Sequence, residues 1–265
     1  MEIIGKISKG SKMDQVYIPK NRIGFSIGNY VIIKPLEEKK PEEKLYFYGV
    51  KHINSVKLGI VKEIMSILDS RLENYENIII AGSFLDEGFQ FNDLDIILIN
   101  KNEITIDKIK KDIEKKIGIT LHFLNLDNKT LAAGLETDPF YQMLLSKCIS
   151  KKRFIYKSKH RINYKLLDLH LLKSKTLIDN FDILSGNEKY DLVRNLMTIS
   201  FYLDSRKISK ELVDAEIKKN FGLKDINELK KNLVNKKTFL KEYKQIYDKT
   251  FTRILRGIKD GAKQE

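Results

Sequence analysis

The sequence has 265 residues with a formal net charge of +13, and 42% of its residues are apolar while 32% are charged. This composition indicates a globular protein with room for two or more compact domains, and a pI of about 9.4 implies an anionic partner, nucleic acid ahead of a membrane. A single cysteine, Cys148, excludes an internal disulfide framework and a multi-cysteine zinc site, and without a recognisable signal peptide or long apolar span we expect a soluble cytoplasmic protein.

The amino-terminal segment, residues 5–36, has a pattern of short strands and turns. An alternating strand over residues 15–18 is stopped by Pro19, and a Gly28-Asn29 turn precedes another apolar run that ends near residue 36. This order resembles the swapped-hairpin β-barrel module of AbrB-like regulators. The resemblance implies a homodimer, because one set of hairpins makes only half of a barrel, and DNA binding through basic residues. These are Lys6, Lys9, Lys12 and Lys20. The alternative is a small β-extension packed on the main domain.

A charged segment follows this module. Residues 37–44, Glu-Glu-Lys-Lys-Pro-Glu-Glu-Lys, carry no large apolar side chain, which is typical of a linker. We therefore expect a small β-module over residues 1–36, the linker, an α+β core over residues 45–157 and a helical bundle over residues 158–265.

The core contains a pair of carboxylates beside a glycine-serine turn. A helix is expected where apolar residues recur from 56 to 68, and the apolar run 78–81 then ends at Gly82-Ser83. After a short loop, Asp93-Leu94-Asp95 opens the next apolar run. Residues two apart in a strand face the same side, so both carboxylates aim at one point, and two hard oxygen ligands suit Mg²⁺. Gly82 lets a phosphate approach the backbone, and Ser83 can hold it.

Gly-Ser, a spacer over residues 84–92 and Asp-x-Asp between apolar strands resemble the motif of the DNA polymerase β-type nucleotidyltransferases. The resemblance covers about residues 50–157 and implies a mixed sheet with covering helices, Mg²⁺ bound by Asp93 and Asp95, and a nucleoside triphosphate, ATP favoured, held by Gly82 and Ser83. The superfamily includes members that have lost catalysis, so fold and activity are separate questions. The alternative is an ordinary strand, turn and strand whose aspartates merely solvate a strand end.

Two departures from the family pattern concern the chemistry. The family places a third carboxylate on a neighbouring strand, whereas the strand expected over residues 118–124 has His122 at the inward position. An imidazole can accept the acceptor hydroxyl's proton or bind metal, although it holds Mg²⁺ less tightly, or His122 is simply a hydrogen-bonded histidine at a strand end. Asp127, just past the strand, is a second candidate. The acidic Asp86-Glu87, where the family often has a basic residue, is expected to repel ATP unless the metal covers it.

A basic cluster with interleaved aromatic residues follows the core, and such a run can neutralise phosphates while the rings stack on bases. The nucleic-acid-binding candidates are Lys151, Lys152, Arg153, Lys157, Lys159 and Arg161. The alternative is a solvated lysine-rich face. Beyond residue 158, apolar stripes predict helices over about 166–177, 190–203 and 240–258, and the resemblance implies that this bundle closes the cleft.

The leading hypothesis is a Mg²⁺-dependent nucleotidyltransferase with Asp93, Asp95 and His122 as catalytic residues and nucleic acid as the favoured acceptor. One alternative is a catalytically impaired member that acts as a DNA- or nucleotide-binding regulator. A third hypothesis is an antitoxin-like protein that adenylylates a partner protein.

Overall fold

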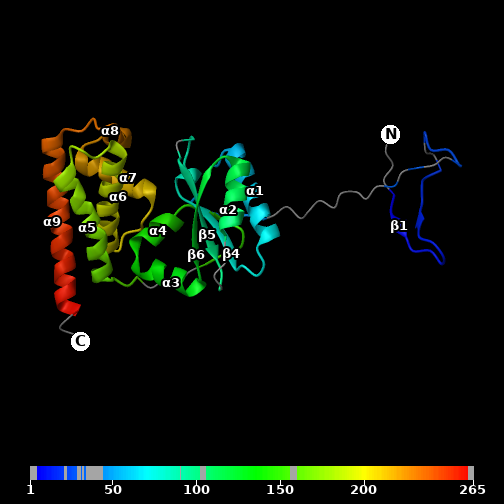
Figure 1. The fold of residues 1–265 in the computed structure, drawn as a ribbon, viewed down its shortest axis with the longest axis horizontal. Coiled ribbons are helices and arrows are strands. Elements are labelled where there is room, and N and C mark those ends of the chain that lie inside the picture. The colour runs from blue at the N-terminus through cyan, green and yellow to red at the C-terminus, as the bar shows by residue number, and fades with distance from the viewer. Residues whose placement is uncertain are drawn as a thin grey trace. The chain divides into compact units, whose positions relative to one another are not determined.

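The computed structural model describes residues 5–20, 23–28, 31, 33, 44–89, 91–101, 106–155 and 160–261. The chain divides into two compact units, Met1–Glu43 and Lys44–Glu265. Each unit contains its own β-sheet (Figure 1).

The amino-terminal unit holds a minimal hairpin. Strand β1 (Ile7–Ser8) pairs antiparallel with β2 (Gln15–Val16), with Ile7 opposite Val16. The strand expected over residues 15–18 is therefore present but shorter. Residues 31 and 33 of the next expected strand have no strand assignment, and the rest of that strand and the linker up to residue 43 lie outside the described residues.

The second unit is built on a mixed sheet with the strand order β3-β7-β4-β5-β6. The strands are β3 (Tyr46–Tyr48), β4 (Asn77–Ala81), β5 (Asp93–Ile99), β6 (Thr120–Leu126) and β7 (Cys148–Ser150). Neighbouring strands are antiparallel except β5 and β6, which are parallel and joined by the crossover helix α2 (Asp107–Ile117). The α+β class expected from the sequence is confirmed.

Helices cover both faces of this sheet, which explains why the central strands are continuous apolar runs. Ile78 and Ile80 pack with α1 (Ser55–Arg71) and α2, whereas Ile79 and Ala81 pack on the opposite face. That opposite face carries α3 (Asn128–Thr137) and α4 (Pro139–Leu145), as Figure 1 shows. Cys148 is fully buried there, and burial raises the pKa of its thiol to about 12, as expected of an inert small hydrophobe.

The carboxy-terminal part is helical and has its own apolar core, to which Phe140 and Met143 of α4 also contribute. It contains α5 (Tyr164–Asn180), α6 (Gly186–Leu203), α7 (Lys210–Phe221), α8 (Ile226–Lys230) and α9 (Lys236–Gly261). The helices expected from the apolar stripes lie within α5, α6 and α9. Among the helices of the described ranges, none is both long and apolar enough to cross a membrane.

A buried tyrosine joins the helical part to the sheet part. The Tyr202 hydroxyl on α6 lies 2.5 Å from the carbonyl oxygen of Glu136 on α3 and 2.9 Å from that of Arg161, which precedes α5. The Tyr202 side chain is fully buried. The hydroxyl therefore donates its hydrogen bond where water cannot replace it.

We predict that Tyr202→Phe lowers the free energy of unfolding by about 0.5–1.5 kcal/mol, because the hydrogen bond from the buried hydroxyl to the Glu136 and Arg161 carbonyl oxygens is lost. Urea denaturation of the full chain measures the change. Tyr17→Phe is the matched control, since the Tyr17 side chain is largely exposed and its hydroxyl should matter little. Equal stability of Tyr202→Phe and the wild type would contradict the proposed role of the hydroxyl.

Candidate metal and nucleotide site

Two strand ends bring the predicted metal ligands together. Asp93 and Asp95 begin β5, and the parallel register places His122 of β6 beside Asp95. The alternation of β5 directs Leu94 and Ile96 into the core beneath α1 and α2, so Asp93 and Asp95 share the opposite face. The expectation that both carboxylates point the same way agrees with this register.

The contacts within the group are close. His122 Nδ1 lies 3.3 Å from Asp93 Oδ2 and 3.7 Å from Asp95 Oδ1. One potential ligand atom from each of the three residues lies within 4.8 Å of the others. The His122 side chain is 59% exposed while the carboxylates are about one-third exposed, so the group is open to solvent from the histidine side.

Position 82 requires a glycine because the Asp95 carboxylate lies against its backbone. Its φ of 84° is in the region that favours glycine, and a Cβ built at this position would lie 2.1 Å from Asp95 Oδ2. The next residues, Ser83–Leu85, form a 3₁₀ turn that is closed by a hydrogen bond from the Asp86 amide to the Ser83 carbonyl (3.0 Å). The exposed Ser83 therefore stands directly beside the carboxylate pair.

The electrostatics of the group favour a cation. Burial and the negative charge of Asp93 raise the pKa of Asp95 above its ordinary value, against the opposing effect of His122. A raised carboxylate pKa means that the charged form is disfavoured in the metal-free fold. A divalent ion held by Asp93, Asp95 and His122 would reverse this effect, because it neutralises both carboxylates.

Asp127 does not belong to the group, contrary to the expectation that it might serve in place of a third carboxylate. It follows β6 at the end opposite the triad, five residues beyond His122, which is about 16 Å along a strand. Its side chain caps α3 by accepting a hydrogen bond from the Thr130 amide (2.6 Å). Hydrogen bonding to the Thr130 side chain and then to its amide lowers the pKa of Asp127.

The acidic loop residue Asp86 is paired with lysines, so the expected repulsion of ATP does not apply to its carboxylate. Its carboxylate forms ion pairs with Lys147 (3.1 Å) and with Lys210 of α7. Lys57 of α1 donates a hydrogen bond to the Asp86 carbonyl oxygen (2.7 Å). Burial alone would raise the pKa of Asp86, but the bonds and charges of Lys210 and Lys147 outweigh it and lower the pKa. The Asp86 carboxylate is therefore balanced by two ammonium groups, and a third cation, Lys57, lies at the backbone of the same residue.

Sequence patterns indicated none of these lysines as functional, although the position of Lys57 in an apolar stripe is unusual for a lysine. Lys57 occupies the apolar stripe of α1, four residues before Val61 and seven before Ile64, and its side chain is only 2% exposed. A lysine at a core position implies a buried partner. Lys147 and Lys210 come to Asp86 through strand register and helix packing, for which local sequence gives no sign.

The first two residues of the predicted nucleic-acid cluster, Lys151 and Lys152, lie at the other end of the sheet. Lys151 and Lys152 follow β7 beside Asn77, where β4 begins, whereas Gly82 follows the end of β4. Lys151 forms an ion pair with Asp69 (2.7 Å), and Lys152 donates to the Tyr75 carbonyl oxygen (3.1 Å). Arg153 is exposed, and Arg161 donates its backbone amide to the Glu136 carbonyl oxygen. Lys157 and Lys159 lie outside the described residues.

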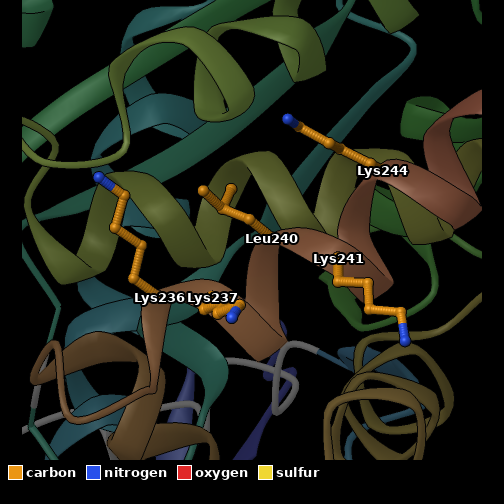
Figure 2. A pocket seen from close by; sticks show the side chains of 5 residues that line it. All are labelled: Lys236, Lys237, Leu240, Lys241 and Lys244. Atoms are coloured by element: carbon orange, nitrogen blue, oxygen red, sulfur yellow. The ribbon is translucent and has the colours of Figure 1, made fainter.

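A separate hollow of about 470 Å³ lies on the first turns of α9. It is lined by Lys236, Lys237, Leu240, Lys241 and Lys244, whose side chains spread in different directions along one helix (Figure 2). Because the lysines do not converge on one point, this surface offers diffuse positive charge instead of a built site. It includes no residue of the Asp93, Asp95 and His122 group.

The comparisons with known proteins give no family for this chain: no protein-family model matches it, and no curated protein matches its sequence.

We predict that Asp95→Asn raises the melting temperature of the metal-free protein at neutral pH. The folded-state pKa is raised, so the favourable contribution of the protonated group is lost as pH rises through that pKa, and an uncharged amide avoids this loss. The expected shift is about 2–4 °C per kcal/mol. Thermal melts in a chelator measure it, and Asp179→Asn on the exposed side of α5 is the control.

The gain from Asp95→Asn should disappear below pH 3.8, the ordinary pKa of an aspartate, because the wild-type side chain is then uncharged as well. A lower melting temperature of the variant at neutral pH would contradict the account of Asp95.

Proposed function

We propose that this chain is a divalent-cation-dependent nucleotidyltransferase, with Mg²⁺ as the expected cofactor, that moves a nucleoside monophosphate from a nucleoside triphosphate to a hydroxyl of an acceptor. The observation that carries the proposal is the Asp93, Asp95 and His122 group packed against Gly82 at the end of β4. The donor set of two carboxylates and one imidazole fits a divalent cation, with His122 in the position of the third ligand. A bound cation would supply charge neutralisation for the phosphates.

In this proposal the residues have distinct tasks. Asp93 and Asp95 hold the cation, and the turn at Gly82-Ser83 receives the phosphates. The acceptor oxygen forms a bond to the α-phosphorus while the bond between that phosphorus and its bridging oxygen to the β-phosphate breaks. Pyrophosphate leaves with the bonding electron pair, and the acceptor proton passes to water or to the free nitrogen of His122.

The distribution of charge at this end of the sheet supports a phosphate substrate. Ala81 of β4 lies opposite Asp95 on one side and opposite Cys148 on the other. Gly82-Ser83 consequently stands between the carboxylates of β5 and Lys147, which directly precedes β7. A metal site on one side and cations on the other match the two halves of a metal-bound triphosphate. Asp95 and Lys147 thus flank one turn.

The acceptor follows from less specific features. The net charge of +13 favours a nucleic acid as the acceptor. ATP is the nucleotide that we expect from the family resemblance. Lys151 and Lys152, which follow β7, are separated from the triad by the length of the sheet. Exposed arginine and lysine side chains, of which Arg153 and the lysines of α9 are examples, provide diffuse attraction to phosphates.

A second candidate function, a DNA- or nucleotide-binding regulator without turnover, is favoured by the amino-terminal unit. Apolar side chains there have large exposed fractions, including 93% for Ile27, 78% for Met13 and 69% for Tyr17. Such a surface favours association with a partner, and a homodimer is the form that we propose. Replacement of the usual third carboxylate by His122 supports the same candidate.

We predict that the full chain, incubated with Mg²⁺ or Mn²⁺ and each α-labelled nucleoside triphosphate in the presence of total RNA, transfers label to a macromolecule. The Asp93→Ala, Asp95→Ala variant should lose the transfer entirely, because the cation ligands are gone. The matched control removes two exposed aspartates elsewhere, Asp179→Ala and Asp260→Ala, and should retain it.

The labelled product also separates the candidate functions. Label in RNA supports the nucleic-acid acceptor, and label in protein supports adenylylation of a partner. No label with any nucleotide, while the same preparation still binds DNA or nucleotide, would contradict the enzyme proposal and favour the regulator.

A further inference from the structure

The ion pairs of Asp86 point to a second part of this site. Resting on the proposed function, we infer that Lys147 and Lys210 form the subsite for the outer phosphates of the nucleotide. In the absence of nucleotide the Asp86 carboxylate occupies this subsite, and the polyphosphate must displace it. The subsite would thus bind a linear polyphosphate chain, with the triphosphate of a nucleotide as its natural form.

The position of the lysines carries the first step of the argument. Lys147 is the residue that strand register places opposite Gly82, since Cys148 pairs with Ala81. Asp86 lies three residues after Ser83 and is joined to it by a backbone hydrogen bond. A phosphate chain that begins at the metal group and passes Ser83 therefore leads toward the Lys147 ammonium.

The chemistry of the contacts carries the second step. Lys147 and Lys210 both donate hydrogen bonds to the Asp86 carboxylate, Lys147 to Oδ1 and Lys210 to Oδ2. Two ammonium groups converging on a pair of oxygens suit a phosphate equally well, and a phosphate brings more negative charge and an additional acceptor. The side chains of Lys147, Lys210 and Asp86 are 19%, 30% and 23% exposed. They are therefore shielded enough for a charge pair to matter while remaining accessible to a ligand.

Lys57 has a different task from the other two lysines. Its ammonium is buried and lies 5.1–5.4 Å from the ring centroids of Phe84, Phe89 and Phe91. It donates to the backbone carbonyl of Asp86, so it holds the position of the loop. Lys57 is thus a positioning residue, and loss of the Asp86 side-chain contacts would leave the loop backbone anchored.

Displacement of Asp86 would also affect the helical part of the chain. Lys210 is the first residue of α7, and its ion pair with Asp86 ties α7 to the loop after β4. A nucleotide that takes the place of the Asp86 carboxylate would hold α7 through its own phosphates. Occupancy of the subsite would in this way couple the helical part to the metal group.

The test measures binding of inorganic tripolyphosphate and of ATP to the full chain by calorimetry in a chelator, which keeps the metal group out of the measurement. Asp86→Asn should bind both about tenfold more tightly, and Lys147→Gln and Lys210→Gln should each bind about tenfold more weakly, as expected for one charge-assisted hydrogen bond. Lys207→Gln, an exposed lysine three residues from Lys210, is the control and should bind like the wild type.

Unchanged affinity in both lysine variants, or weaker binding by folded Asp86→Asn, would overturn the subsite. Tighter binding of an RNA oligonucleotide than of tripolyphosphate through the same lysines would overturn its assignment to a polyphosphate. If Asp86→Asn does not give a cooperative thermal melt, the two lysine variants decide alone. Label transfer that depends on Asp93 and Asp95 but not on Lys147 or Lys210 would refute this inference and leave the proposed function standing.

Discussion

The half-buried carboxylate of Asp95 is the group on which the arrangement of the site depends. It stands beside a second carboxylate, and both burial and that neighbour disfavour its charge. The surrounding residues are consistent with this constraint: Gly82 leaves room for the carboxylate oxygen, and His122 is the partner that can offset its charge. Strand β4 and most of β5 are buried and apolar, so the stability of the unit comes from the two faces of the sheet while this corner retains unfavourable electrostatics.

Opposite charges lie on the two sides of Gly82 at the end of β4. The carboxylates of β5 lie on one side, next to His122 of β6, and Lys147 lies on the β7 side. Asp86 joins the two lysines that lie on different parts of the chain, one before β7 and one on α7. A formal charge of +13 would by itself predict only nonspecific attraction to anions. The local separation of charge is the feature that favours a metal-bound phosphate substrate.

The sequence predicted the parts of the fold that depend on local pattern. Apolar runs located the strands that end at Gly82 and begin at Asp93, and helical spacing located α1, α5, α6 and α9. The alternation of the strand predicted an inward position for His122, whereas its side chain is 59% exposed and lies beside Asp93 and Asp95. Sequence did not predict that Asp127 caps α3, although an aspartate directly before a helix is one of the preferred N-cap residues. In the amino-terminal unit, the described strands are shorter than their alternating pattern suggested.

The remaining errors arise from contacts between segments that are distant along the chain. The basic run after β7 follows the core in sequence, and the antiparallel register of β4 and β7 places Lys151 at the end of the sheet opposite the site. The same register brings Lys147 to the site. Asp86 appeared repulsive because its partner Lys210 is 124 residues away in sequence. Such pairings are set by strand order and helix packing, which periodicity does not encode.

The most direct test of the central claim is a Mn²⁺ titration of the full chain, followed by electron paramagnetic resonance in the presence of a non-hydrolysable ATP analogue. The account predicts saturable Mn²⁺ binding that is lost in Asp93→Asn, weakened in His122→Ala, and stronger than Mg²⁺ binding in competition, because imidazole suits Mn²⁺ better than Mg²⁺. Mn²⁺ binding that is unchanged in both variants, or no Mn²⁺ binding by the folded wild-type chain, would contradict it.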